Sequence, residues 1–170
     1  YVTPELAFEY HYFFTRKLML IKESQAFVCL PGGVGTLDET FELLTLTQTG
    51  KGVPVPIVLL DEPGDPYWGE VDALMQSLVR RGLVSADDTS LYTITDSCEE
   101  ACRIIDRFYA NYDSIRFVGD QLIMRLRQAP DDVQLAHLNE QFAHLVERGE
   151  ITRTGPFKAE IRDDDHVELE

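Results

Sequence analysis

The segment AFVCLPGGVGTLDETFELLTLTQTGK, residues 26–51, decides the fold of this chain. It opens with five apolar residues, turns after Pro31 through three glycines, and continues with apolar residues along one helical stripe. A short apolar run bounded by turn residues is typical of a strand covered on both faces. We therefore predict a strand, a tight glycine turn and then a helix over 36–49.

The same strand-to-helix pattern continues along the chain. Apolar runs at 55–61 and 91–95 predict two further strands, and the helical patterns at 65–83 and 96–112 follow them. An aromatic-rich helix over 3–24, with Thr3 as its N-cap and Pro4 at its first position, precedes the first strand. Strands separated by helices of this length predict right-handed crossovers. The fold class is α/β, a Rossmann-like parallel sheet with flanking helices.

The predicted sheet is narrow, and this suggests how the chain divides. Three strands leave an edge unprotected, and a helix comes first with no strand before it, so we expect that part of the domain lies upstream. The last residues change character: 114–126 read as a strand with a glycine interruption, 131–149 as an amphipathic helix, and 166–170 as a strand. We predict a nucleotide-binding domain over 1–112 and a small strand-helix-strand extension of unknown role over 113–170.

Composition excludes several classes of partner. Fifteen lysines and arginines against 30 aspartates and glutamates give a net charge of −15, which repels nucleic acid and anionic lipid surfaces. No apolar run reaches the roughly 18 residues of a membrane span. Three cysteines without a signal peptide suggest reduced thiols, hence a soluble, cytoplasmic protein. We expect Cys98 and Cys102 to pack in the fold rather than to form a metal site, since no further ligand motif accompanies them.

The glycine turn is the first candidate site. It lies beyond the carboxyl end of a strand, where α/β sheets bind ligands, and the free amides at a helix start favour an anion such as phosphate. Glycines there allow positive φ and close approach, although they also serve simple tight turns. The P-loop and dinucleotide patterns do not fit, because Thr36, Leu37 and Asp38 stand where other residues are required. Asp61 at the next strand end suits either a ribose contact or turn chemistry.

Glu39 has two interpretations from local pattern. Thr36 followed three residues later by Glu39 is a capping box, in which each side chain satisfies the other's backbone amide. The alternative is a carboxylate placed next to a bound ligand. Arg16 and Lys17, fifteen positions before Pro31, favour the second interpretation because they add basic groups ahead of the same strand.

These residues resemble the paired RKxxM and PGGxGTxxE motifs of the LONELY GUY family of lysine-decarboxylase-like proteins. Every fixed position of the second motif is matched, whereas Leu20 stands at the methionine position of the first. The resemblance covers roughly residues 1–110. It implies a Rossmann-like fold and hydrolysis of the N-glycosidic bond of a nucleoside 5′-monophosphate, a cytokinin ribotide or AMP, to free base and ribose 5-phosphate. It also implies a homodimer with the site near the subunit boundary.

The resemblance also assigns roles within the site. Glu39 and Arg16 are the expected catalytic pair, the carboxylate stabilising the oxocarbenium-like sugar or orienting water. The expected phosphate- and ribose-binding residues are Gly32, Gly33, Gly35, Thr36 and Lys17. No cofactor and no metal are expected, because nothing in the sequence supports a pyridoxal phosphate site.

Other readings remain open at this stage. The turn would also suit a non-catalytic nucleotide-binding module, or a structural fragment in which Thr36 and Glu39 only cap a helix. Tyr10, His11 and Tyr12 suit core packing better than base stacking. His137 and His144 are expected on the surface. If these 170 residues are the whole polypeptide, we expect weak turnover.

Overall fold

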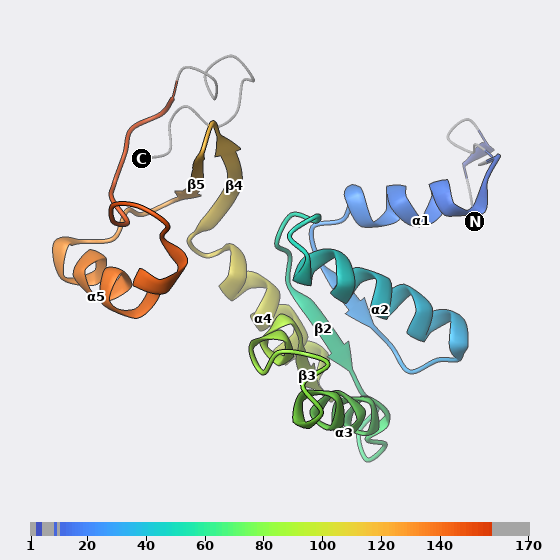
Figure 1. Ribbon diagram of the computed structural model, residues 1–170. Coiled ribbons are helices and arrows are strands. Elements are labelled where there is room, and N and C mark those ends of the chain that lie inside the picture. Colours follow the sequence, from blue (N-terminus) through green and yellow to red (C-terminus); the bar gives the residue numbers. More distant parts are fainter. Residues whose placement is uncertain (1–2, 5–8, 10, 158–170) are drawn as a thin grey trace. The chain divides into compact units, whose positions relative to one another are not determined.

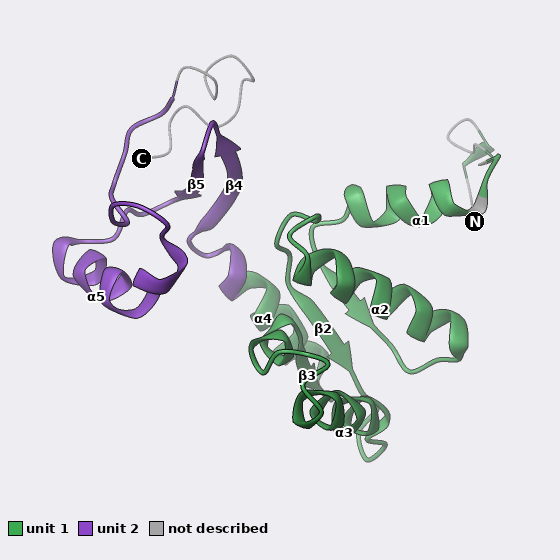
Figure 2. Ribbon diagram, viewed as in Figure 1, with its two compact units in different colours: residues 1–106 green, residues 107–170 purple. Residues whose placement is uncertain are grey.

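The computed structural model describes residues 3–4, 9 and 11–157 (Figure 1). The chain forms two compact units, Tyr1–Asp106 and Arg107–Glu170, coloured separately in Figure 2. The first unit is a three-stranded parallel sheet with flanking helices, and the second contains an antiparallel hairpin. The predicted α/β fold class is therefore confirmed.

The sheet of the first unit has the order β1-β2-β3, formed by Phe27–Cys29, Ile57–Leu60 and Thr93–Thr95. Both pairings are parallel, with Phe27 opposite Ile57 and Val58 opposite Thr93. All four residues of β2 are buried, as expected for a central strand. The edge strand β1 is not covered on both faces as predicted, because Val28 remains 44% exposed.

Two crossover helices cover one face of this sheet. Helix α2, Val34–Gln48, connects β1 to β2, and α3, Tyr67–Arg80, leads through the short helix η2, Asp87–Leu91, to β3. Because both connections step in the same direction across the sheet, right-handed crossovers place α2 and α3 on the same side. Their buried side chains share one core cluster with β2 and Tyr92: Leu43, Leu44, Ile57, Leu59, Trp68, Met75 and Tyr92.

The remaining helices of this unit are α1, Phe13–Lys22, and α4, Cys98–Tyr109. Helix α1 is shorter than the predicted helix over 3–24, because Tyr12 has extended backbone angles of φ −125° and ψ 136°. Arg16 and Lys17 lie in the first half of α1. Residues 5–8 and 10 of the predicted helix lie outside the described residues.

The second unit begins with the last residues of α4 and continues with a hairpin of β4, Tyr112–Val118, and β5, Gln121–Leu126. The sequence reading of one strand with a glycine interruption is replaced by two antiparallel strands, because Gly119 takes a positive φ of 62° between them and reverses the chain. Helix α5, Asp132–Phe142, follows and is shorter than predicted. The strand predicted at 166–170 lies outside the described residues.

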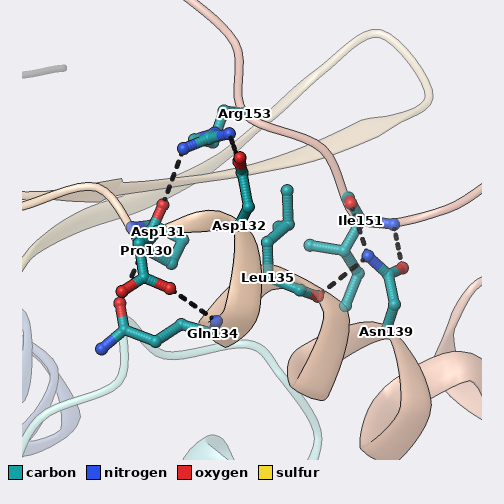
Figure 3. Close-up of polar contacts among 8 residues, drawn as sticks. All are labelled: Pro130, Asp131, Asp132, Gln134, Leu135, Asn139, Ile151 and Arg153. Atoms are coloured by element: carbon teal, nitrogen blue, oxygen red, sulfur yellow. Dashed lines mark hydrogen bonds and ion pairs between the residues drawn. The ribbon is translucent and has the colours of Figure 1, made fainter.

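Figure 3 shows how the segment after α5 is attached to this helix. Asp131 forms a capping box with Gln134, and the Asn139 side chain exchanges hydrogen bonds with the backbone of Ile151. Arg153 donates to the Pro130 carbonyl at 3.1 Å and also pairs with Asp132. The polar contacts therefore hold an extended stretch against the helix without a third strand among the described residues.

Candidate active site at the start of α2

The glycine turn joins the carboxyl end of β1 to α2, and the helix begins earlier than the sequence suggests. Gly33 is the N-cap, with φ −88° and ψ −162°, and its carbonyl accepts the first helical hydrogen bond from the Leu37 amide at 3.2 Å. Thr36 is therefore the third helical residue and not the cap. No side chain caps this helix.

This start position removes the capping-box interpretation of Thr36 and Glu39. A capping box requires its threonine at the N-cap, and here that position belongs to Gly33. Glu39 falls in the second turn of α2, and its side chain is 46% exposed. The first amides of the helix, which have no intrahelical acceptor, are left for another partner.

The three glycines of the turn have different surroundings. A Cβ atom on Gly32 would lie 2.2 Å from Oγ1 of Thr36, so no other residue fits there without displacing the start of the helix. A Cβ on Gly33 or Gly35 would meet nothing within 4 Å. None of the three takes the positive φ that the sequence analysis allowed for. All three glycines leave the backbone without a side chain over it. A ligand can therefore approach the amides of Gly33 and Gly35.

The start of α3 makes one contact with the glycine turn and one with the residue that follows β2. The Tyr67 hydroxyl donates a 2.7 Å hydrogen bond to the carbonyl of Gly32. The carboxylate of Asp61, directly after β2, accepts from the Trp68 amide at 2.8 Å. Of the two predicted roles of Asp61, a ribose contact or a contact that stabilises a turn, the structure shows the second. The contact of Tyr67 with Gly32 was not predicted from the sequence, because no local pattern indicates a contact between residues 35 positions apart.

Lys17 is the basic residue that the structure brings to α2. Its Nζ lies 2.7 Å from Asp38 Oδ2, 2.7 Å from Glu42 Oε2 and 3.9 Å from Glu39 Oε1. The side chain is only 13% exposed, so Lys17 does not face solvent. Its hydrogen bonds, that to Asp38 first and that to Glu42 second, raise the pKa of Lys17 above its ordinary value and keep it an ammonium.

Arg16, its neighbour, is exposed and makes no hydrogen bond or ion pair with any described residue. The structure pairs Glu39 with Lys17 and leaves Arg16 open to solvent. The described residues therefore show uncapped amides at the start of α2 and an exposed carboxylate at Glu39, and no described contact joins Arg16 to either of them.

A hollow lies beyond the carboxyl ends of β2 and β3. It has a volume of about 300 Å³ and is lined by Asp61, Glu62, Gly64, Asp65, Pro66 and Asp96. Parallel strands end at one edge, so this acidic hollow and the glycine turn share the carboxyl side of the sheet. Among the described residues, no group of three or more His, Cys, Asp or Glu side chains is arranged to hold a metal ion.

Other predicted residues lie on the surface. Cys98 and Cys102 are exposed on α4, so their predicted packing role is wrong, whereas Cys29 is half-buried in β1. His11 and Tyr12 are exposed, contrary to the predicted core packing, and Tyr10 lies outside the described residues. The surface positions of His137 and His144 are confirmed. No described helix is both long enough and apolar enough to cross a membrane.

Comparison with known proteins places the first unit in a family. Residues 3–105 match the family model described as "Possible lysine decarboxylase". The chain is 28% identical over 100 residues to the probable cytokinin riboside 5′-monophosphate phosphoribohydrolase LOGL1 of Oryza sativa subsp. japonica, covering 59% of this chain and 44% of that protein. The corresponding enzyme of Mycobacterium tuberculosis (strain ATCC 25618 / H37Rv) is 36% identical over 91 residues, 52% of this chain and 46% of that protein.

A plant relative gives the same picture. Cytokinin riboside 5′-monophosphate phosphoribohydrolase LOG1 of Arabidopsis thaliana is 28% identical over 100 residues, which are 59% of this chain and 46% of that protein. The matched part of the chain thus corresponds to less than half the length of each of these curated relatives. The matched residues include the glycine turn, α2 and the first half of α1.

Proposed function

Because this chain belongs to the family described as possible lysine decarboxylases, whose relatives named above are phosphoribohydrolases, we propose that it hydrolyses the N-glycosidic bond of a nucleoside 5′-monophosphate. The products are a free base and ribose 5-phosphate. The substrate class is a purine monophosphate such as AMP or a cytokinin ribotide.

The observation that carries this proposal is the uncapped start of α2. The helix begins at Val34 with glycine before it, so the amides of its first turn meet no side-chain acceptor. Those amides and the helix dipole favour an anion, and a phosphate monoester is the anion that the predicted substrate carries. Gly33 and Gly35 leave the space above them open for it.

Glu39 is the proposed group that acts on the sugar of a nucleotide whose phosphate is bound there. It follows Val34 by five residues, which is about 7.5 Å along a helix axis and comparable to the reach of a ribose from its 5′-phosphate. Breaking the bond between C1′ and the base nitrogen leaves positive charge on the ribose, which an ionised carboxylate stabilises. Water then supplies the hydroxyl at C1′ and a proton to the departing base, and Glu39 orients that water.

Arg16 is proposed to contact the substrate rather than Glu39. Its guanidinium is exposed and unengaged by the described residues, and a planar fork of donors matches phosphate or ribose oxygens. Thr36, packed against Gly32, adds the last amide of the first turn. These roles follow the motif positions of the family.

A pyridoxal-phosphate-dependent decarboxylation does not fit these residues. Schiff-base chemistry requires a lysine amine that has lost its proton, which desolvation or a neighbouring cation normally brings about. Lys17, the lysine of the motif, is instead held as an ammonium by Asp38 and Glu42. Lys22 and Lys51 are exposed on the surface, away from any enclosed site.

The decisive experiment is base release from AMP by the purified chain and by its Glu39→Gln variant. The amide keeps the shape of the side chain but not the charge, so base release should fall by about 10²- to 10⁴-fold. The thermal midpoint should stay unchanged because Glu39 caps nothing. Glu70→Gln, an exposed change in the first turn of α3, is the matched control. Binding of AMP by the unaltered chain without base release would instead identify a non-catalytic nucleotide-binding module.

We also propose a homodimer that works in the cytoplasm. Apolar side chains on α1 remain exposed, including Phe14 at 66% and Leu18 at 54%, and Val28 and Leu30 add to them at the sheet edge. Exposed apolar groups of this kind favour association. All three cysteines are free thiols, which suits a reducing compartment. Light scattering on the purified chain tests the dimer.

A further inference from the structure

The ammonium of Lys17 already has carboxylate partners within the protein. It has three donors, and two of them point at 2.7 Å to the carboxylates of Asp38 and Glu42. These two acids are four residues apart and therefore lie on the same face of α2. Lys17 thus links helix α1 to two carboxylates of α2.

A third carboxylate stands beside this pair. Oε1 of Glu39 lies 3.9 Å from Nζ, too long for a hydrogen bond but within ion-pair range. The three acids of α2 would repel one another without a cation between them. The positive charge of Lys17 lies within 4 Å of all three carboxylates, offsets this repulsion and favours positions close to Nζ.

We propose that Lys17 is a positioning residue for Glu39, holding this carboxylate on the α1 side of α2, and that it does not bind the substrate phosphate. This inference rests on the proposed function, because it assigns Lys17 a place in the same site. It replaces the expectation, taken from the motif, that Lys17 contacts phosphate or ribose.

Two observations support separate roles for Lys17 and Arg16. Two of the three ammonium donors of Lys17 are used by Asp38 and Glu42, so a phosphate bound to Lys17 would lie beside two carboxylates and be repelled by them. Arg16 has no such commitment, since it is exposed and unpaired among the described residues. Adjacent residues on a helix point about 100° apart, so one serves the protein and the other the substrate.

The test compares Lys17→Met, Lys17→Arg and Lys22→Met in the full chain. Lys22 lies in the same helix with a 70% exposed side chain, so its variant matches the loss of charge at a distance from the three acids. Base release from AMP gives kcat and KM, and calorimetry with ribose 5-phosphate gives phosphate binding directly. Thermal midpoints establish that each variant is folded.

For Lys17→Met we expect kcat to fall by about tenfold or more while KM and the Kd for ribose 5-phosphate stay within about twofold. Lys17→Arg should recover most of kcat, because a guanidinium also bridges carboxylates. A weaker Kd with kcat unchanged would make Lys17 a phosphate ligand and overturn the inference, as would normal kinetics in Lys17→Met. An unaltered chain that binds AMP but releases no base would overturn the proposed function itself, and this inference with it.

Discussion

The hydroxyl of Tyr67 donates a 2.7 Å hydrogen bond to the backbone carbonyl of Gly32, so the first residue of α3 fixes the turn that precedes α2. The carbonyl of Gly32 faces Tyr67, and its Cα lies against Thr36. The amides that follow are thereby held in one orientation before any ligand arrives. Preorganised donors bind an anion more tightly than donors that must first be ordered.

Tyr67→Phe should therefore weaken nucleotide binding without unfolding the chain. The ring keeps its edge-on packing against Trp68, at 4.9 Å between centroids, and only the hydroxyl is lost. We expect AMP to bind weaker by about 0.5–1.5 kcal/mol, with a nearly unchanged thermal midpoint. Calorimetry measures the first quantity, and Tyr12→Phe, an exposed ring on the same unit, serves as control. Equal affinities in all three proteins would contradict this role for Tyr67.

Gly35→Ala should separate stability from binding. Gly35 is the second residue of α2, with nothing within 4 Å of an added Cβ, so alanine gains helix propensity of up to about 1 kcal/mol. If the glycine is there to let phosphate approach, the same methyl group should weaken nucleotide binding. Urea unfolding and calorimetry on one preparation give both values. Raised stability with full affinity would show that the space above Gly35 is not used.

Gly32→Ala should have the opposite effect on stability. Its Cβ would lie 2.2 Å from Oγ1 of Thr36, so the turn or the first helical residues must move. We expect a loss of about 1–3 kcal/mol in the free energy of unfolding, measured in urea, together with weaker binding. A stability equal to that of the unaltered protein would mean that the turn adapts more readily than the structure indicates.

The glycine turn shows which parts of the fold could be predicted from the sequence and which could not. The strands were predictable because each is a short apolar run followed by turn residues and a helical pattern. The start of α2 was not, because Gly35 is a poor helix former and local propensity moved the expected boundary to Thr36. In the fold, the contact of Gly32 with Thr36 and the bond from Tyr67 decide the boundary instead.

The contacts made by the candidate site residues could not be predicted from the sequence. The motif pairs Arg16 with Glu39, whereas in the structure Glu39 forms an ion pair with Lys17. Which side of α1 faces α2 depends on the packing of two helices that are linked through a strand, and neighbouring letters in the sequence do not encode it. The same limit applies to Tyr67, whose partner is 35 residues away.

Arg16→Ala should lower affinity for nucleoside monophosphates by about 1.5–3 kcal/mol, the range of a charge-assisted contact. Arg81→Ala is the control, because this exposed residue follows the far end of α3, about 20 Å from Tyr67 by helix length. It removes the same charge without touching the site. Similar losses for both variants would indicate a general field effect, and unchanged calorimetry for Arg16→Ala would remove this residue from the site.

Tyr92 should make the stability of the first unit sensitive to alkaline pH. Its ring is 8% exposed, and its hydroxyl donates a 2.6 Å hydrogen bond to Asp72. Burial first, and this bond second, raise the pKa of Tyr92 well above its ordinary value. Below the unfolded pKa of about 10 both states keep the proton and the stabilisation is complete. Above it the unfolded chain loses the proton and the folded chain retains it, so the free energy of unfolding falls as pH rises.

Tyr92→Phe tests this sign. At pH 8 the variant should be less stable by about 0.5–1.5 kcal/mol, because the bond to Asp72 is lost. At pH 11 the gap should shrink, since phenylalanine has no proton to lose in the unfolded state. Urea unfolding at the two pH values measures both gaps, with Tyr12→Phe as the exposed control. A gap that stays constant or widens towards pH 11 would show that the buried hydroxyl of Tyr92 is not what couples folding to alkaline titration.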